Sequence, residues 1–227
     1  MFRLSPSQIL PDNSGRVALR PTFVYELSNK YVADPYWFVN PAVVSVQFIA
    51  DFPGAAYCSI KKKPTIKRHH LKYLGQYAPA WKTMEYMTLG NMLTLYRSLL
   101  NLDDKRAIAA KFGINQTSVF ENYMESMRCI RNICAHGSVL YDAKLFFRIK
   151  RGPAGKLSQD ETSRLGGAIK VLAYLLGKVS INRRHEMIIS LNDAYMKSIN
   201  KSPVLGQIIE DASQMKWDLP NISQLDK

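Results

Sequence analysis

The sequence predicts a mainly α-helical protein, from the spacing of its apolar residues and the placement of proline. From residue 79 onward, apolar residues recur every three or four positions, which is the period of one helix face. Prolines punctuate residues 1–60, so we expect no long uninterrupted helix there. They are Pro6, Pro11, Pro21, Pro35, Pro41 and Pro53. The expected fold is a helical bundle with an irregular, Pro-rich N-terminal segment.

Residues 1–60 give the weakest indications of secondary structure. The stretch Val39 to Ala50 is apolar and rich in β-branched residues, and its periodicity does not decide between a buried helix and a strand. The next stretch combines dense positive charge with Leu and Tyr residues, which favours a short amphipathic helix. Its basic residues are Lys61, Lys62, Lys63, Lys67, Arg68, His69, His70 and Lys72.

A helical region is expected over residues 61–149. Pro79 stands where a helix can begin, and apolar residues continue at helical spacing from Trp81 to Leu99. Asp103 or Asp104 can cap a short helix that follows. The region ends at a linker of Gly, Pro and Lys residues, Lys150 to Lys156.

The C-terminal part, residues 157–227, is expected to add helices that pack on the same bundle. Apolar spacing predicts helices over about residues 158–179 and 182–199, and a shorter one near residues 204–215.

The most informative helix runs from Gln116 to about His136, where Gly137 stops it. Its buried face is predicted to be Phe120, Tyr123, Met127, Ile130 and Cys134. On the polar side, Arg128, Asn132 and His136 follow at four-residue spacing, and Arg131 lies at the edge of the apolar stripe. The alternative is an ordinary solvated face, on which a histidine favours the negative end of the helix.

The charge balance favours a polyanionic partner. The chain has 31 Lys and Arg residues against 18 Asp and Glu residues, a net charge of +13. Binding of cations to phosphates releases condensed counterions, so this excess favours nucleic acid. A surface made basic for solubility and an anionic membrane are the alternatives.

The cysteines and hydropathy give no sign of a metal site or a membrane segment. Cys58, Cys129 and Cys134 lack the spacing of a disulfide framework and are expected to be reduced thiols of a cytoplasmic protein. Cys58 with His69 and His70 fits no zinc pattern. We therefore expect no metal and no other cofactor. We also expect no membrane partner, because no apolar run reaches the length of a membrane span.

A family resemblance sharpens the interpretation of the long helix. Arg131-Asn132-Ile133-Cys134-Ala135-His136 matches the R-x4-H pattern of HEPN domains, in the form R-N-x-x-A-H. The wider sequence from Trp81 resembles the Abi-like proteins of the AbiD/AbiF abortive-infection family. The matching segments are Pro79-Ala80-Trp81, Thr88-Leu89-Gly90, Ala110-Lys111-Phe112-Gly113 and Arg128 to Leu140, with weaker likeness at Pro35-Tyr36-Trp37-Phe38 and Met215 to Leu219.

The resemblance implies a HEPN-like bundle that acts on RNA in phage defence, often as a homodimer with two motifs in one cleft. It implies metal-independent cleavage, in which the RNA 2′-hydroxyl attacks the neighbouring phosphodiester. His136 would exchange protons, Arg131 would stabilise the phosphoryl oxygens, and Asn132 would orient His136 or bind a phosphate oxygen. Arg128 is expected to bind RNA, together with the basic residues Lys61, Lys62, Lys63, Lys67, Arg68 and Lys72. Compared with the family, the region before Pro35 is short, so either the N-terminal part is shortened or another chain supplies the missing helices.

Helix geometry adds a condition. On a straight helix, Arg131 and His136 point roughly 140° apart. They can converge if the helix ends near Gly137, or if a second subunit contributes to the same phosphate site, and the second route makes dimerisation a functional requirement.

Two other functions remain open from the sequence. Residues 105–123 have the spacing of a helix-turn-helix, which would indicate a DNA-binding regulator, although the second helix carries Phe120, Tyr123 and Met124 and no base-reading arginine before Arg128. A bundle of this kind could instead hold a small RNA or a toxin-antitoxin partner without cutting.

Overall fold

The computed structural model describes residues 14–136 and 139–216 of the chain. Over these residues the protein is helical, with isolated β-bridges and no strand, so the predicted mainly α fold is confirmed. The chain divides into two compact units, residues 16–111 and residues 1–15 with 112–227, and each is described by itself. The divisions expected from the sequence were at residue 60 and at the 150–156 linker.

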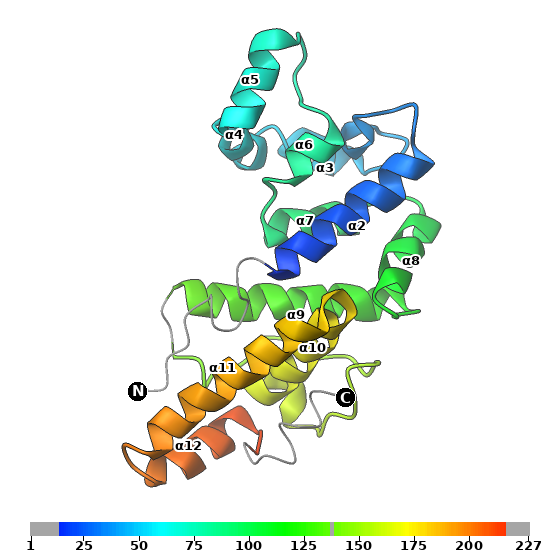
Figure 1. The fold of residues 1–227 in the computed structure, drawn as a ribbon. Coiled ribbons are helices and arrows are strands. Elements are labelled where there is room, and N and C mark those ends of the chain that lie inside the picture. The colour runs from blue at the N-terminus through cyan, green and yellow to red at the C-terminus, as the bar shows by residue number, and fades with distance from the viewer. Residues whose placement is uncertain (1–13, 137–138, 217–227) are drawn as a thin grey trace. The chain divides into compact units, whose positions relative to one another are not determined.

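The unit of residues 16–111 is made of short helices around one long helix (Figure 1). In chain order they are α2 (Ser14–Lys30), η2 (Trp37–Val39), α3 (Val46–Asp51), α4 (Ala55–Lys61), α5 (Pro64–Lys72), α6 (Ala80–Met84), α7 (Leu89–Ser98) and α8 (Leu102–Lys111).

Helix α2 corrects the expectation that residues 1–60 hold no long helix. It continues for 17 residues through Pro21, which cannot donate a backbone hydrogen bond. Leu19, Phe23 and Leu27 recur every four residues and are at most 1% exposed. Burial of three such side chains contributes roughly 1.5–3 kcal/mol each, which outweighs the ~3 kcal/mol cost of an internal proline. The expectation failed because tertiary burial overrides the local signal of proline.

The apolar stretch 39–50, which the sequence left between helix and strand, forms an isolated β-bridge followed by the helix α3. Val44 forms an isolated antiparallel bridge with Leu99. Ser45 then caps α3, because its Oγ accepts a hydrogen bond from the N–H of Phe48 at 3.4 Å.

The helical spacing predicted from Pro79 to Leu99 is interrupted once, between α6 and α7. Thr88 caps the second helix, accepting from the N–H of Asn91 at 3.1 Å. Met84 and Met92 are buried as the spacing predicts, whereas Trp81 is 52% exposed. The break changes the helix phase, so one apolar stripe does not cover both pieces.

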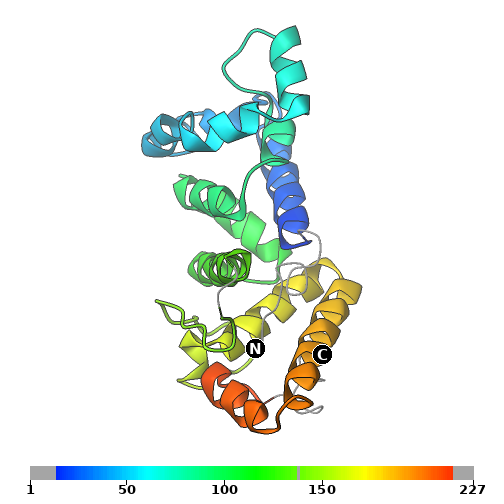
Figure 2. The ribbon, with the colours of Figure 1, turned by 90° about the vertical axis from the view of Figure 1, so that its left-hand side faces the viewer.

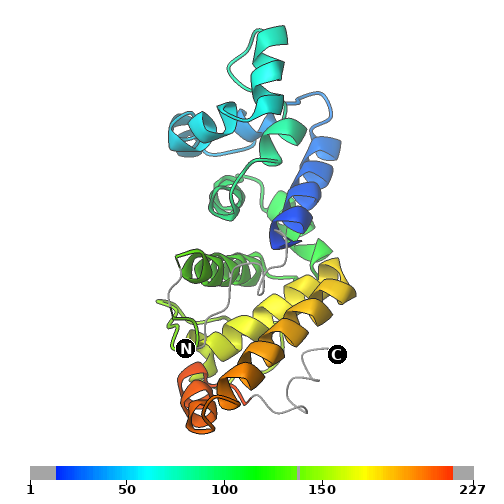
Figure 3. The same cartoon turned by 60° about the vertical axis from the view of Figure 1, so that its left-hand side comes forward.

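The other unit is built on α9 (Thr117–Ala135), with η3 (Glu161–Ser163), α10 (Leu165–Val179), α11 (Ile181–Ile199) and α12 (Val204–Ser213). Helices α10 and α11 run side by side in Figure 3, and Figure 2 shows them diverging from the turn that joins them. The predicted helices at 182–199 and 204–215 are confirmed within two residues. The helix predicted from residue 158 begins only at Leu165, after the turn of η3.

The predicted buried face of α9 is confirmed. All five of its residues are at most 5% exposed: Phe120, Tyr123, Met127, Ile130 and Cys134. Val119, Met124 and Ser126 are also buried, so the middle of α9 is enclosed on most sides. None of the described helices is both long and apolar enough to cross a membrane.

Candidate functional site

The R-x4-H residues lie at the C-terminal end of α9. The helix is regular to Ala135, and the backbone N–H of His136 closes the last turn by donating to the carbonyl oxygen of Asn132 at 3.0 Å. The His136 side chain is exposed, while Arg131 and Asn132 are half-buried. The apolar face ends at Cys134, and the polar groups therefore reach solvent where the buried part of the helix stops.

Arg131 and Asn132 contact each other directly. Nη1 of Arg131 donates to Oδ1 of Asn132 at 3.0 Å, which holds the guanidinium beside the helix. Within the described part of the chain, no hydrogen bond joins Arg131 to His136. The two lie roughly 140° apart around α9 and about 7.5 Å apart along it. The regular helix geometry up to Ala135 therefore does not turn the two side chains toward each other, and Gly137 lies outside the described residues.

Arg128 is held by Glu125, a residue that sequence reasoning missed. The guanidinium bonds both carboxylate oxygens, with Nε at 3.2 Å from each. Glu125 is only 8% exposed, and the hydrogen bond to it raises the pKa of Arg128. The spacing of three residues between opposite charges is the sequence signal for this pair. The carboxylate offsets the charge that Arg128 was expected to offer to RNA.

The two cysteines of α9 are poor nucleophiles. Burial raises the pKa of Cys129 and of Cys134 to about 11, so both thiols are protonated near neutral pH. Cys129 also directs its Sγ toward Oε1 of Glu125 at 3.8 Å. These side chains stabilise the helix packing and supply no reactive group to the site.

The histidines of α5 are engaged in packing. His69 is buried and stacks on Tyr73 with ring centroids 4.9 Å apart, and this burial lowers its pKa. His70 shares a hydrogen bond of 3.1 Å with the hydroxyl of Tyr57. In the described residues, no three His, Cys, Asp or Glu side chains form a cluster that could hold a metal ion.

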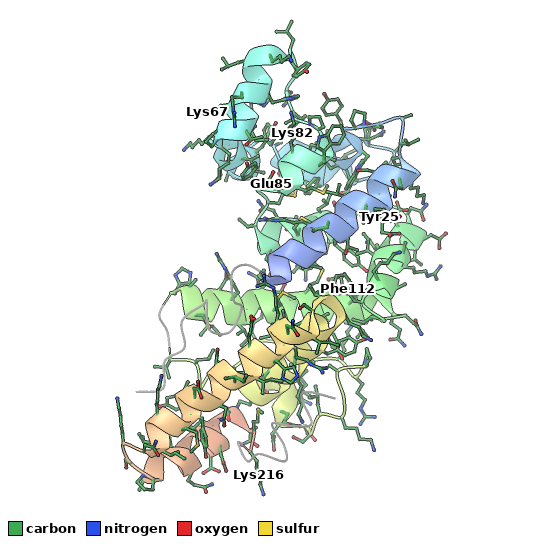
Figure 4. The ribbon with its side chains drawn as sticks, viewed as in Figure 1. Tyr25, Lys67, Lys82, Glu85, Phe112 and Lys216 are labelled. Atoms are coloured by element: carbon green, nitrogen blue, oxygen red, sulfur yellow. The ribbon has the colours of Figure 1, made fainter. Side chains whose placement is uncertain are left out.

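The sequence-predicted basic cluster belongs to the unit of residues 16–111. Its members Lys61, Lys62, Lys63, Lys67, Arg68 and Lys72 are all exposed. They follow the end of α4 and the surface of α5, where Lys67 is labelled in Figure 4. Two of these lysines lie over aromatic rings, Lys61 over Tyr57 at 5.4 Å and Lys72 over Tyr73 at 5.6 Å. This cluster is an open charged surface on one unit, and the R-x4-H residues belong to the other.

The burial of α9 disfavours the helix-turn-helix interpretation. A recognition helix presents its first turns to the DNA groove. Phe120, Tyr123 and Met124 are fully buried instead. The early part of α9 is therefore structural, and only its C-terminal end offers a polar face of chemical interest.

Comparison with known proteins places the chain in a family. The family model described as Abi-like protein matches residues 16–142. This range covers more than half of the chain. The protein belongs to the Abi-like family. The matched range includes the whole unit of residues 16–111 and continues through α9 past His136, while α10, α11 and α12 lie outside it. No curated protein and no solved structure matches the chain.

Proposed function

We propose that this Abi-like protein is an RNA-binding, HEPN-type protein of abortive infection, and that it cleaves RNA without a metal ion. The observation that supports this most is the end of α9. An exposed His136 follows the bonded pair Arg131 and Asn132, within the range that the family model matches. The net charge of +13 suits a polyanionic substrate.

The chemistry uses the 2′-hydroxyl of RNA as nucleophile. Its oxygen attacks the adjacent phosphorus, the bond from phosphorus to the 5′-oxygen breaks, and the products carry a 2′,3′-cyclic phosphate and a 5′-hydroxyl. One group accepts the 2′-hydroxyl proton and another donates a proton to the leaving 5′-oxygen. Histidine suits both roles near neutral pH. Arginine stabilises the charge that develops on the phosphoryl oxygens.

Two protomers supply what one lacks. A single chain offers one His136, and its Arg131 points away from it around the helix. In a homodimer with two α9 ends in one cleft, one imidazole accepts the proton and the other donates it. Arg131 of one protomer then reaches the phosphate next to His136 of its partner. Dimerisation is therefore part of the proposed mechanism.

The test is incubation of the purified full chain with end-labelled RNA in the presence of a chelator. We expect products that end in a 2′,3′-cyclic phosphate, and no cleavage when the RNA carries a 2′-deoxy residue at the cut site. His136→Ala and Arg131→Ala abolish cleavage, and Arg131→Lys restores little because it lacks the forked donors. His185→Ala, which removes an exposed histidine on α11, is the matched control. Cleavage that persists in the His136→Ala variant contradicts the proposal.

A non-catalytic RNA-binding protein is the second candidate. It is favoured by the divergence of Arg131 and His136 on one regular helix and by the engagement of Arg131 with Asn132. Such a protein would hold a small RNA, in the manner of a toxin-antitoxin scaffold. It binds RNA in the same assay without products, and binding survives both alanine substitutions.

A further inference from the structure

Two adjoining hollows lie on the surface of the unit that contains α9, beside the loop of residues 151–157. The first has a volume of about 470 Å³ and lies between this loop and the helices α10 and α11. The second, of about 520 Å³, is formed by the loop itself. Pro153 and Gly155 line both hollows, which therefore adjoin at these residues, and the two hollows together are called the basic groove.

The loop that borders the groove is fixed against α9. A Cβ atom on Gly152 would meet the hydroxyl of Tyr123 at 2.6 Å and Cγ1 of Val119 at 2.7 Å, so only glycine fits there. The N–H of Ala154 donates to the same hydroxyl at 3.3 Å. Asn122 holds the approach to the loop by accepting from the N–H of Lys150 at 2.9 Å. One wall of the groove is therefore a loop held in place by α9, although the composition of residues 150–156 suggested a linker.

The far wall comes from the ends of α10 and α11. Tyr174 is anchored because its hydroxyl donates to the carbonyl oxygen of Phe112 at 2.7 Å. Lys178 lies over the Tyr174 ring at 5.2 Å. Arg184 packs close to Gly177, where a Cβ would be 3.0 Å from its Nη1. Anchored neighbours therefore hold the basic side chains of this wall beside the hollow.

The groove is basic throughout. Its lining includes five cationic side chains and no carboxylate: Arg151, Lys156, Lys170, Lys178 and Arg184. Lys170 is neutralised by Glu161, with Nζ and Oε1 2.5 Å apart. Arg151, Lys156 and Lys178 form no ion pair with any carboxylate in the described residues. Such a concentration of cations around a depression raises the local concentration of anions.

We propose that the basic groove binds the phosphodiester backbone of single-stranded RNA, at a site separate from the R-x4-H motif. The cations are distributed over two hollows, so they suit a chain of phosphates better than one phosphate group. This inference rests on RNA being the ligand of the protein, and it adds a second binding surface for it. All the lining residues lie outside the range matched by the Abi-like family model.

The groove and the motif are connected by α9. Gly152 touches Val119 and Tyr123 in the first third of the helix, whereas His136 caps its other end. The rise of an α-helix places Tyr123 and His136 about 20 Å apart along the axis. An RNA strand bound in the groove is therefore anchored away from the proposed site of chemistry.

The experiment measures binding of a fluorescent single-stranded RNA of about 16 nucleotides, the upper end of typical single-strand site sizes. The full chain carries His136→Ala, so that the probe stays intact, and titrations are repeated at several salt concentrations. The groove variant is Arg151→Gln with Lys156→Gln and Lys178→Gln. The matched control removes the same charge from exposed lysines elsewhere in the same unit, with Lys197→Gln, Lys201→Gln and Lys216→Gln.

The groove variant binds the RNA more weakly than the control. The slope of its log affinity against log salt concentration flattens by about 0.7 for each phosphate that the variant no longer neutralises. Equal affinity and equal slope in the two variants overturn the proposal. A mononucleotide or a poly-glutamate chain that binds these cations as tightly as the RNA also overturns it, in favour of a small phosphorylated ligand or an acidic protein segment.

Failure of the groove and failure of the proposed nuclease are distinguishable. With His136 present, a groove variant that raises KM and retains kcat supports both proposals. Loss of RNA binding in the groove variant, in a protein that never cuts RNA, supports the groove and rejects the nuclease. Cleavage with unchanged KM in the groove variant supports the nuclease and rejects the groove. A parent protein that binds no RNA rejects both.

Discussion

The two ends of α9 have the same helical backbone and opposite surroundings. Val119 to Met127 are enclosed almost completely, and Tyr123 in their midst holds the neighbouring loop through its hydroxyl. From Arg131 to His136, polar groups reach solvent. The comparison teaches that one helix can serve packing at one end and present polar groups to solvent at the other. Substitutions at the two ends should therefore affect different measurements.

The largest effect is expected for the buried end. Phe120→Ala removes a fully buried ring and should lower the free energy of unfolding by about 3–5 kcal/mol. His136→Ala should change it by no more than about 0.5 kcal/mol, because the side chain is exposed. Denaturant unfolding followed by circular dichroism measures both. Equal destabilisation by the two variants would show that His136 is structural.

The pair at the boundary of the two ends comes next. Glu125→Gln and Arg128→Gln each leave a partly buried polar group without its charged partner, and each should destabilise the protein by about 1–3 kcal/mol. The double variant should lose less than the sum of the two. Additive losses in this double-mutant cycle would mean that the pair contributes no coupling energy.

A smaller effect is expected at the exposed end. Asn132→Ala removes the acceptor that holds the Arg131 guanidinium. We expect about a tenfold fall in the kcat/KM of RNA cleavage, which corresponds to the free energy of one hydrogen bond to a charged group. Asn132→Asp keeps an acceptor oxygen at that place and should retain more activity than Asn132→Ala. The reverse order would indicate that the amide N–H binds the substrate and that Asn132 does not position Arg131.

The last prediction concerns thiol chemistry. At pH 8, Ellman's reagent should modify the exposed Cys58 rapidly and the buried Cys129 and Cys134 slowly, and Cys58→Ser should remove the fast phase. A thiol pKa raised from 9.0 to about 11 contributes stability that is complete below pH 9 and is lost as the pH rises toward 11. The melting temperature should fall over this window, and less so in Cys129→Ala. A fast reaction of three thiols would contradict the enclosure of α9.

The sequence predicted α9 well because its pattern is local. Phe120, Tyr123 and Ile130 repeat at helical spacing, and their burial follows from that spacing alone. The exposed position of His136 follows in the same way. Whether the motifs of two protomers meet in one cleft does not follow from this spacing, because it depends on how a second protomer packs.

The failures of sequence reasoning involve interactions between distant residues. Pro21 was expected to end helices, but burial of its neighbours sustains α2. The Lys150–Lys156 stretch has the composition of a linker, and its contact between Gly152 and Tyr123 joins residues far apart in the sequence. The basic groove was missed for the same reason, because its cations come from three separate segments of the chain. The Lys61–Lys72 cluster is instead a single run, which a count of charge along the sequence detects.

The rigidity of α9 has a consequence for where RNA would be cut. A continuous helix cannot shorten or lengthen as a strand slides past it, so the span between the loop at Gly152 and the imidazole of His136 is constant. A transcript held at the first point meets the second at a set number of nucleotides from its anchor. An unstructured RNA too short to reach from the groove to His136 should then be cut less efficiently than one long enough to span both points.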